Sequence, residues 1–154
     1  MRVAVVTGAA QGIGRRVTEV LAERGYRLAL NDLQMPDATI QSIRSRGSEA
    51  LGYAGNVADE SAVEGFVRRV YEVWGRSDVL VNNAGISLIA PAENISADDF
   101  RRVIEVNLVA PFLLAKAFGT QMLAAGTVAL SMSLRLRVLW ELRIGRLTTP
   151  RNMD

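Results

Sequence analysis

An apolar stretch at the amino terminus of the chain runs directly into a glycine-rich segment. Residues 3–6, Val-Ala-Val-Val, have the composition of a buried strand, and Gly8, Gly12 and Gly14 follow closely. A strand, a glycine turn and a helix in this order place backbone N–H groups at a helix N-terminus, where they bind phosphate groups. The sequence therefore predicts a turn at residues 7–14 that binds the pyrophosphate of a dinucleotide.

Each of the three glycines has its own expected role. Gly8 makes the tight turn after the strand, Gly12 lets the backbone approach a pyrophosphate, and Gly14 allows the helix to pack closely on the strand. The residues after Gly14 have the apolar spacing of a core-facing helix, which Gly25 ends. The helix expected after Gly14 therefore supports the prediction of a phosphate-binding turn.

A carboxylate follows the second apolar run of the chain. Residues 26–30 form that run, and Asn31-Asp32 comes directly after it. This position lies roughly 20 residues beyond the glycines, where a dinucleotide site places the acid that binds the ribose. Asp32 is therefore predicted to bind the adenosine ribose. A solvated loop carboxylate is the alternative, and the sequence leaves it open.

Strands and helices continue to alternate beyond Asp32. We expect strands and helices in turn at residues 36–46 (helix), 50–54 (strand), 59–74 (helix), 78–82 (strand) and 96 onward (helix). This alternation is typical of an α/β fold with a parallel sheet.

The last of these helices carries a capping box and a proline. Ser96 and Asp99 form the capping box, and one face is expected to point inward. The residues of that face are Phe100, Val103, Ile104 and Leu108. Pro111 has no N–H, and its ring displaces the carbonyl of Asn107 four residues earlier. That carbonyl either holds a water molecule or marks a simple kink, and both interpretations stay open.

Composition excludes several kinds of chemistry. The chain has no cysteine and no histidine, so disulfides, thiol catalysis and imidazole acid–base catalysis are excluded, and no metal site is expected. No apolar run is expected to cross a membrane, and a strand begins directly after Met1-Arg2 without a secretory signal. We therefore expect a cytoplasmic protein that binds neither nucleic acid nor membrane.

Three motifs in order give the chain a family resemblance. Thr-Gly-x-x-x-Gly-x-Gly at residues 7–14, Asn-Asn-Ala-Gly at 82–85, and Asn107 within Val-Asn-Leu resemble the short-chain dehydrogenase/reductase family over residues 1–126. The resemblance implies a Rossmann-like doubly wound parallel sheet in three layers, α/β/α, in an incomplete domain at 1–126. It also implies hydride transfer between a nicotinamide cofactor and a secondary alcohol or ketone, in a homo-oligomer.

The same resemblance assigns roles to individual residues. Asp32 implies NAD rather than NADP, whose 2′-phosphate it would repel, although Arg15 softens that preference. Asn107 corresponds to the asparagine that anchors a water in the family's proton relay. The remaining residues assigned to the cofactor are Gly8, Gln11, Gly12, Ile13, Gly14, Leu33, Asn56, Val57, Asn83, Ala84 and Gly85. Asn56 stands where the family often has an aspartate beside the adenine.

The sequence departs from the family at its catalytic residues. The family uses Tyr-x-x-x-Lys with a serine upstream, because a cation beside the tyrosine lowers its pKa toward the working pH. The tyrosines here are Tyr26, Tyr53 and Tyr71, and none has a lysine four residues later. The only lysine is Lys116, with Phe112 four residues before it. The chain as written is therefore expected to be catalytically inactive.

Residues 127–154 differ in character from the rest. They carry five arginines against Glu141 and Asp154, a net charge of +3, and are rich in leucine. Permitted codons read one base earlier restore Tyr-x-x-x-Lys, with the tyrosine at the position of Thr148 and the lysine at that of Asn152. The same frame places a serine at the position of Arg135. We interpret 127–154 as an aberrant basic tail, read out of frame after the loss of one base near residues 126–127.

Two other interpretations remain. A non-catalytic NAD-binding protein would need only residues 1–126 to fold. A membrane-associating remnant would follow from the basic, leucine-rich tail.

Overall fold

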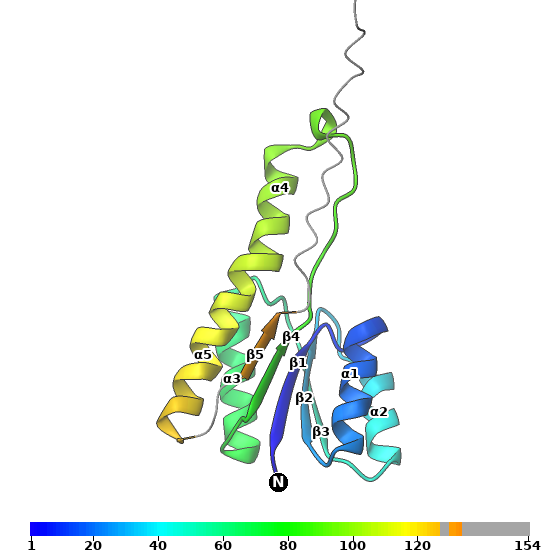
Figure 1. Ribbon diagram of the computed structural model, residues 1–154, viewed down its shortest axis with the longest axis vertical. Coiled ribbons are helices and arrows are strands. Elements are labelled where there is room, and N and C mark those ends of the chain that lie inside the picture. The colour runs from blue at the N-terminus through cyan, green and yellow to red at the C-terminus, as the bar shows by residue number, and fades with distance from the viewer. Residues whose placement is uncertain (127–129, 134–154) are drawn as a thin grey trace, which may run out of the picture.

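The computed structural model describes residues 1–126 and 130–133, and it contains a parallel sheet covered on both faces by helices (Figure 1). Five strands lie in the order β3-β2-β1-β4-β5, and neighbouring strands pair in parallel. The strands are β1 (Val3–Thr7), β2 (Arg27–Asp32), β3 (Ala50–Ala54), β4 (Val79–Asn82) and β5 (Leu130–Ser133). The predicted three-layer, doubly wound α/β fold is confirmed.

The helices follow the expected alternation closely. They are α1 (Gly12–Glu23), α2 (Asp37–Ser45), α3 (Glu60–Trp74), α4 (Ala97–Ile104) and α5 (Ala110–Ala124), with a short 3-10 turn η1 (Ala92–Asn94) and a π-helical segment η2 (Glu105–Val109). The capping box predicted for α4 is present, because the Ser96 hydroxyl oxygen accepts the Asp99 N–H at 3.0 Å. Strand β5 follows residue 126, and the boundary predicted there stays a prediction.

The domain has two hydrophobic cores, one on each face of the sheet, and strand β1 lies between them. Its residues are fully buried, and alternate side chains enter opposite faces of the sheet. Val3 and Val5 pack with α3 and α5, whereas Ala4 and Val6 pack with α1 and α2. A central strand covered on both faces needs apolar side chains on both, which explains the unbroken Val-Ala-Val-Val run.

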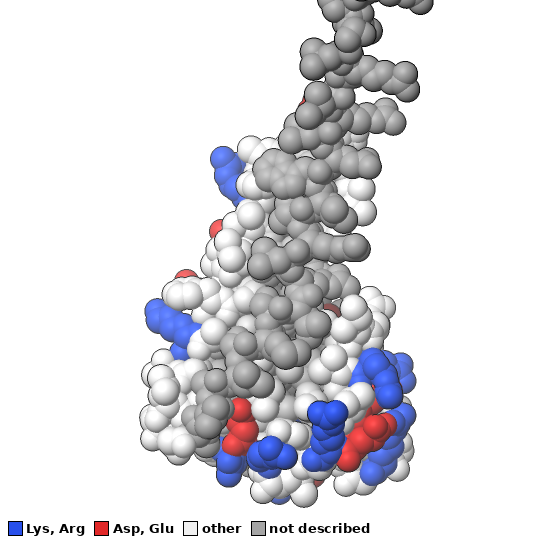
Figure 2. Space-filling view, in the orientation of Figure 1, with Lys and Arg blue, Asp and Glu red and all other residues white. Residues whose placement is uncertain are grey.

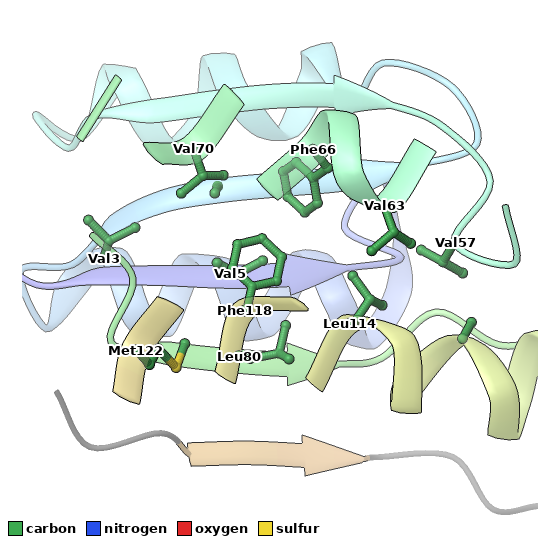
Figure 3. Packing of buried hydrophobic residues seen from close by; sticks show 12 residues of the cluster. Val3, Val5, Val57, Val63, Phe66, Val70, Leu80, Leu114, Phe118 and Met122 are labelled. Atoms are coloured by element: carbon green, nitrogen blue, oxygen red, sulfur yellow. The ribbon is translucent and has the colours of Figure 1, made fainter. Parts of the chain in front are cut away.

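The core under α3 and α5 is built around two phenylalanines. Phe66 of α3 and Phe118 of α5 meet edge to face, with ring centroids 5.6 Å apart, and Tyr53 stacks on Phe66 at 5.3 Å. Figure 3 shows both rings between the helices and the strands, with Leu114 and Met122 of α5 beside them. This packing fixes α5 on the same face of the sheet as α3.

The segments α4, η2 and α5 form one continuous helix, and the inward face predicted for its first half is only partly correct. Val103 is buried, but Phe100 is 37% exposed and Leu108 is 55% exposed. Figure 1 shows α4 extending beyond the ends of the strands, so the sheet does not cover its length. Helical periodicity marks an apolar face, but it does not show whether an element lies against it.

The same helix corrects the expectation about membrane-spanning length. Among the described residues, Ala97–Ala124 is long and apolar enough to cross a membrane by length and composition, with a mean hydropathy of 1.4. Its buried side chains, Ala110, Leu114, Phe118 and Met122, belong to the core over the sheet. The helix is therefore part of the fold of this domain.

Charged side chains of both signs are interspersed at the lower end of the molecule in Figure 2. Surface ion pairs of the domain include Arg27 with Glu49 at 2.8 Å and Arg46 with Glu23 at 3.2 Å. Such exposed pairs contribute little to stability, about 0–1 kcal/mol each.

A partly buried carboxylate joins the beginnings of β1 and β4. Asp78 Oδ2 accepts the Val3 N–H at 2.7 Å and a hydrogen bond from Arg76 Nε at 3.0 Å. Burial by itself raises the pKa of Asp78, but the hydrogen bonds from Arg76 and Val3 outweigh it and hold the pKa below its ordinary value. The ionised form therefore stabilises the folded state.

We predict that Asp78→Asn lowers the free energy of unfolding at neutral pH by about 1.5–3 kcal/mol, the contribution of hydrogen bonds to a charged group. Because the folded-state pKa is lowered, this contribution is complete above roughly pH 4 and is lost as the pH falls through the folded-state value. Urea unfolding at neutral and acidic pH measures it. Asp98→Asn, which removes an exposed pair with Arg101, is the control and should change stability little. Equal effects of the two substitutions would contradict this account of Asp78.

Candidate cofactor site

A cleft of about 710 Å³ opens at the carboxyl ends of the strands. The chain leaves β1 toward β2 on one side, whereas β4 pairs with β1 on the other, so the cleft lies where the order of the strands reverses. Open α/β sheets bind their ligands at this point, and the volume is within the usual range for small-molecule sites.

Most of the residues that the sequence assigns to a cofactor line this one cleft. They are Gly8, Gln11, Gly12, Ile13, Asp32, Leu33, Asn56, Val57, Asn83, Ala84 and Gly85. Gly14 and Asn107 do not line the cleft themselves. Each contacts residues that do: Gly14 lies against Gly8 and Asn83, and Asn107 bonds to Ile86. The fold thus brings together four segments that are far apart in sequence.

The glycine turn is shaped by close packing as well as by backbone conformation. A Cβ on Gly14 would overlap Gly8 O, and it would lie 2.5 Å from Asn83 Nδ2. Gly12 differs, because it has a φ of +57° and a Cβ there would meet no described atom within 4 Å. Gly14 therefore allows the helix to pack closely, as predicted, whereas Gly12 leaves bare backbone at the cleft.

Four hydrogen bonds join the glycine turn to the end of β4. Thr7 Oγ1 accepts the N–H groups of Asn83 at 3.1 Å and Ala84 at 3.0 Å. In return, Asn83 Nδ2 donates to the carbonyls of Thr7 and Gly8, both at 3.0 Å. We name this group the Thr7–Asn83 junction. It holds two walls of the cleft at a fixed separation.

Asp32 lies at the end of β2, and two backbone N–H groups orient its carboxylate. Its Oδ2 accepts the Ala10 N–H and its Oδ1 accepts the Leu33 N–H, both at 2.8 Å. Arg15, the residue expected to soften the preference for NAD, pairs through Nε with Glu19 at 3.4 Å on the same helix. A fixed carboxylate therefore stands directly beside the glycine turn.

Asn31, at the end of β2, forms hydrogen bonds with the backbone at the end of β3. Its buried Nδ2 donates to Tyr53 O at 3.2 Å and to Gly55 O at 3.1 Å. Asn56 follows Gly55 in the loop after β3, and its Oδ1 accepts the Ala58 N–H at 3.1 Å. These contacts place Asn56 and Val57 in the wall of the cleft that lies beyond Asp32.

Asn107 holds the loop after β4 against the long helix. Its Oδ1 accepts the Ile86 N–H at 2.9 Å, and its Nδ2 donates to Ile86 O at 2.8 Å. It lies within the π-helical segment η2, and the helix changes geometry just before Pro111. The change agrees with a break in the helical hydrogen bonds near Pro111, while the water at the Asn107 carbonyl stays a prediction.

Sequence reasoning missed several residues that shape the cleft. Thr39 is buried, and Arg102 and Glu105 of the long helix line the cleft. A signal existed for Thr39, because it is a polar residue on the apolar helix face that Ile40 and Ile43 share. Arg102 and Glu105 gave no such signal, since exposed charges on a helix are common.

The family model for short chain dehydrogenases matches residues 2–134. The chain belongs to this family. A D-threitol dehydrogenase from Mycolicibacterium smegmatis is 39% identical over 127 residues, which cover 81% of this chain and 49% of that protein. An uncharacterised oxidoreductase from Thermotoga maritima is also 39% identical over 127 residues, covering 81% of this chain and 50% of its own length. The chain spans about half the length of the curated relatives it matches.

Solved structures of the family agree with the fold. A metagenomic short-chain oxidoreductase, crystallised in complex with NADP, superposes with a TM-score of 0.79 at 35% identity. The superposition covers 84% of this chain and 60% of that chain. A nicotinamide dinucleotide is therefore the cofactor class of the family to which this domain belongs.

We predict that Gly14→Ala destabilises the domain by about 1–3 kcal/mol, because the added methyl group overpacks the turn. It should also abolish measurable dinucleotide binding, since the turn must move to admit the methyl group. Thermal unfolding and calorimetric titration measure the two effects. Gly119→Ala is the matched control, because a Cβ there meets no described atom within 4 Å. Within a helix it should stabilise by about 0.5–1 kcal/mol. Tolerance of Gly14→Ala would show that the close approach is not required.

Proposed function

We propose that these residues bind a nicotinamide dinucleotide and prefer NAD to NADP. One observation carries the proposal: the glycine turn, Asp32 and the loop after β4 converge on a single cleft. The first turn of α1 offers N–H groups and a partial positive charge to the pyrophosphate. Asp32 faces the ribose position from the end of β2.

The preference for NAD follows from the charge of Asp32. Two backbone N–H groups hold its carboxylate in place, so it accepts hydrogen bonds from ribose hydroxyls without first having to be ordered. A 2′-phosphate at the same position would meet a fixed like charge. The Arg15 side chain bonds to Glu19 on the same helix, so it does not neutralise the charge of Asp32.

Asp32→Asn tests this preference with little change of shape, because an amide oxygen still accepts the Ala10 N–H. Loss of the charge should raise the ratio of NADP to NAD affinity by about tenfold or more, since each 1.4 kcal/mol changes affinity tenfold. Calorimetric titrations with both cofactors measure the ratio. Asp37→Asn, an exposed carboxylate outside the cleft, should leave the ratio unchanged. A ratio that is the same in all three proteins would rule out Asp32 as its cause.

The activity of the family is a separate part of the proposal. Bound nicotinamide supplies a hydride donor or acceptor, and the complete protein would transfer hydride to or from a secondary alcohol or ketone. The 154 residues as written lack Tyr-x-x-x-Lys, so we propose that they bind cofactor without turning substrate over. The Asn107 side chain holds Ile86 and thereby shapes the cleft wall.

We further propose that residues 127–154 are read out of frame. The alternative frame restores the tyrosine, the lysine and the serine at the positions of Thr148, Asn152 and Arg135, all of which lie outside the described residues. Strand β5 pairs with β4 from Val79↔Leu130 to Asn82↔Ser133, and the alternative frame also encodes an apolar strand at this point.

Restoring the frame gives a direct test. DNA from the codons for Gly126 and Thr127 onward should encode the restored motif one base earlier, and a chain expressed in that frame should reduce or oxidise a test series of small alcohols and ketones with NAD(H). The matched control replaces the restored tyrosine by phenylalanine and should be inactive. A genomic sequence without those codons would reject this interpretation of the tail.

A membrane-associating remnant is the second candidate. It is favoured by the basic, leucine-rich composition of residues 127–154. Leu108, Phe112 and Leu123 on η2 and α5 add exposed apolar surface, at 55%, 64% and 75% exposed. Co-sedimentation with liposomes that disappears when residues 127–154 are removed would support it. A cytoplasmic protein without membrane affinity, and the homo-oligomer of the family, remain our expectations.

A further inference from the structure

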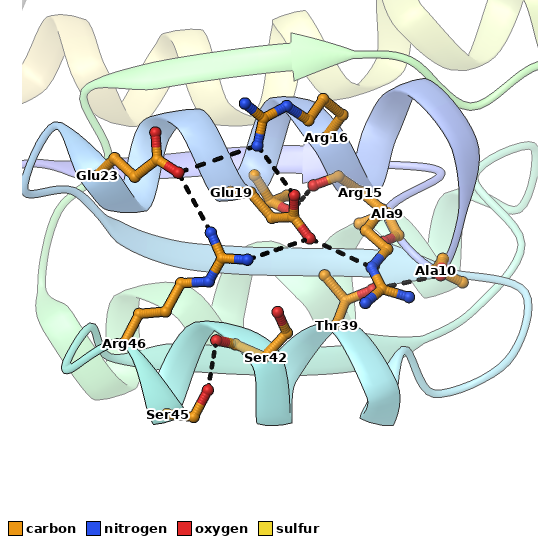
Figure 4. Close-up of polar contacts among 11 residues, drawn as sticks. Ala9, Ala10, Arg15, Arg16, Glu19, Glu23, Thr39, Ser42, Ser45 and Arg46 are labelled. Atoms are coloured by element: carbon orange, nitrogen blue, oxygen red, sulfur yellow. Dashed lines mark hydrogen bonds and ion pairs between the residues drawn. The ribbon is translucent and has the colours of Figure 1, made fainter.

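Thr39 of α2 reaches the phosphate-binding turn from a helix that the cofactor motif does not include. Its side chain is fully buried, and its Oγ1 lies 2.9 Å from Ala9 O and 3.2 Å from Ala10 O (Figure 4). The hydroxyl carries one proton, so the two carbonyls share it. A residue 29 positions along the chain thus contacts the turn just before Gln11.

The N–H groups of the same two residues are held from the opposite side. Ala9 donates to Asn31 O at 3.1 Å, and Ala10 donates to Asp32 Oδ2 at 2.8 Å. The backbone of Ala9 and Ala10 is therefore fixed between β2 and α2. The next residues, Gln11 and Gly12, begin α1 and line the cleft.

A second fully buried threonine on a helix, Thr18, behaves differently. Its Oγ1 donates at 2.6 Å to Arg15 O within the same helix. Thr39 is in the first turn of α2, and its hydroxyl bonds to carbonyls outside that helix. Its hydroxyl therefore fixes the turn, whereas the hydroxyl of Thr18 satisfies its own helix.

Helix α2 is itself held against α1 at its other end. Arg46, directly after α2, pairs with Glu23 at 3.2 Å and with Glu19 at 3.9 Å, as Figure 4 shows. The turn, α1 and α2 are thus joined at both ends. A movement of α2 would change the direction in which the first N–H groups of α1 point.

We propose that Thr39 is a positioning residue for the dinucleotide: its hydroxyl holds Ala9 and Ala10 so that the N-terminus of α1 faces the pyrophosphate. The inference rests on the proposed function, because it concerns the affinity of the same cleft. It adds α2 to the elements on which that affinity depends.

The test compares two identical substitutions at equally buried sites, Thr39→Val and Thr18→Val. Each removes a buried hydroxyl and keeps the volume of the side chain. Thr39→Val should raise the Kd for NAD about tenfold, the equivalent of one hydrogen bond of about 1.4 kcal/mol. Thr18→Val should change it less than about twofold, and Thr39→Ser should restore the affinity of the unmodified chain.

Amide hydrogen exchange gives a second measurement that does not need the cofactor. Exchange of the Ala10 N–H should become faster in Thr39→Val and stay unchanged in Thr18→Val and Thr39→Ser. Faster exchange at Ala10 would show that the hydroxyl restrains the turn itself.

The outcomes separate the inference from the proposed function. If the unmodified chain binds no NAD, the proposed function fails. If it binds NAD and Thr39→Val binds equally well, or if both valine variants weaken binding alike, Thr39 has no positioning role. If Thr39→Val does not fold while Thr18→Val does, the hydroxyl is required for folding, and the inference is also wrong.

Discussion

The Thr7–Asn83 junction is the interaction on which the cleft depends. It joins the first strand to the fourth through side chain to backbone bonds in both directions, so neither segment can shift without breaking several bonds at once. Both Thr7 and Asn83 are buried, where an unpaired polar group costs about 1–3 kcal/mol. Gly8 and Gly14 are needed because the junction brings backbone and side chain so close that a Cβ at either position has no space.

A second constraint acts from the other side of the turn. Asp32 and Asn31 at the end of β2 receive the N–H groups of Ala10 and Ala9, and Thr39 donates to their carbonyls. All of these contacts lie within residues 1–126. Tyr-x-x-x-Lys is missing from the chain as written, and none of these contacts involves it.

Local patterns predicted much of the fold and the main features of the cleft. The glycine turn, Asp32 and the helix at 59–74 follow from periodicity and spacing, which depend on neighbouring residues. Thr39 and Asn31 were missed because their partners lie more than twenty residues away, and only the fold brings them together. Phe100 was wrongly placed in the core, since an apolar face on a helix does not reveal where the sheet beneath it ends.

The most direct test of the account is a titration of the isotopically labelled 154-residue chain with NAD, followed through its backbone amide signals. We predict saturable shifts at the amides of residues 8–14, at those of 83–85 and at Asp32, with small changes elsewhere. This pattern would place the dinucleotide in the cleft between the glycine turn and β4. A folded protein whose signals do not respond to NAD, or respond away from these segments, would contradict the central claim.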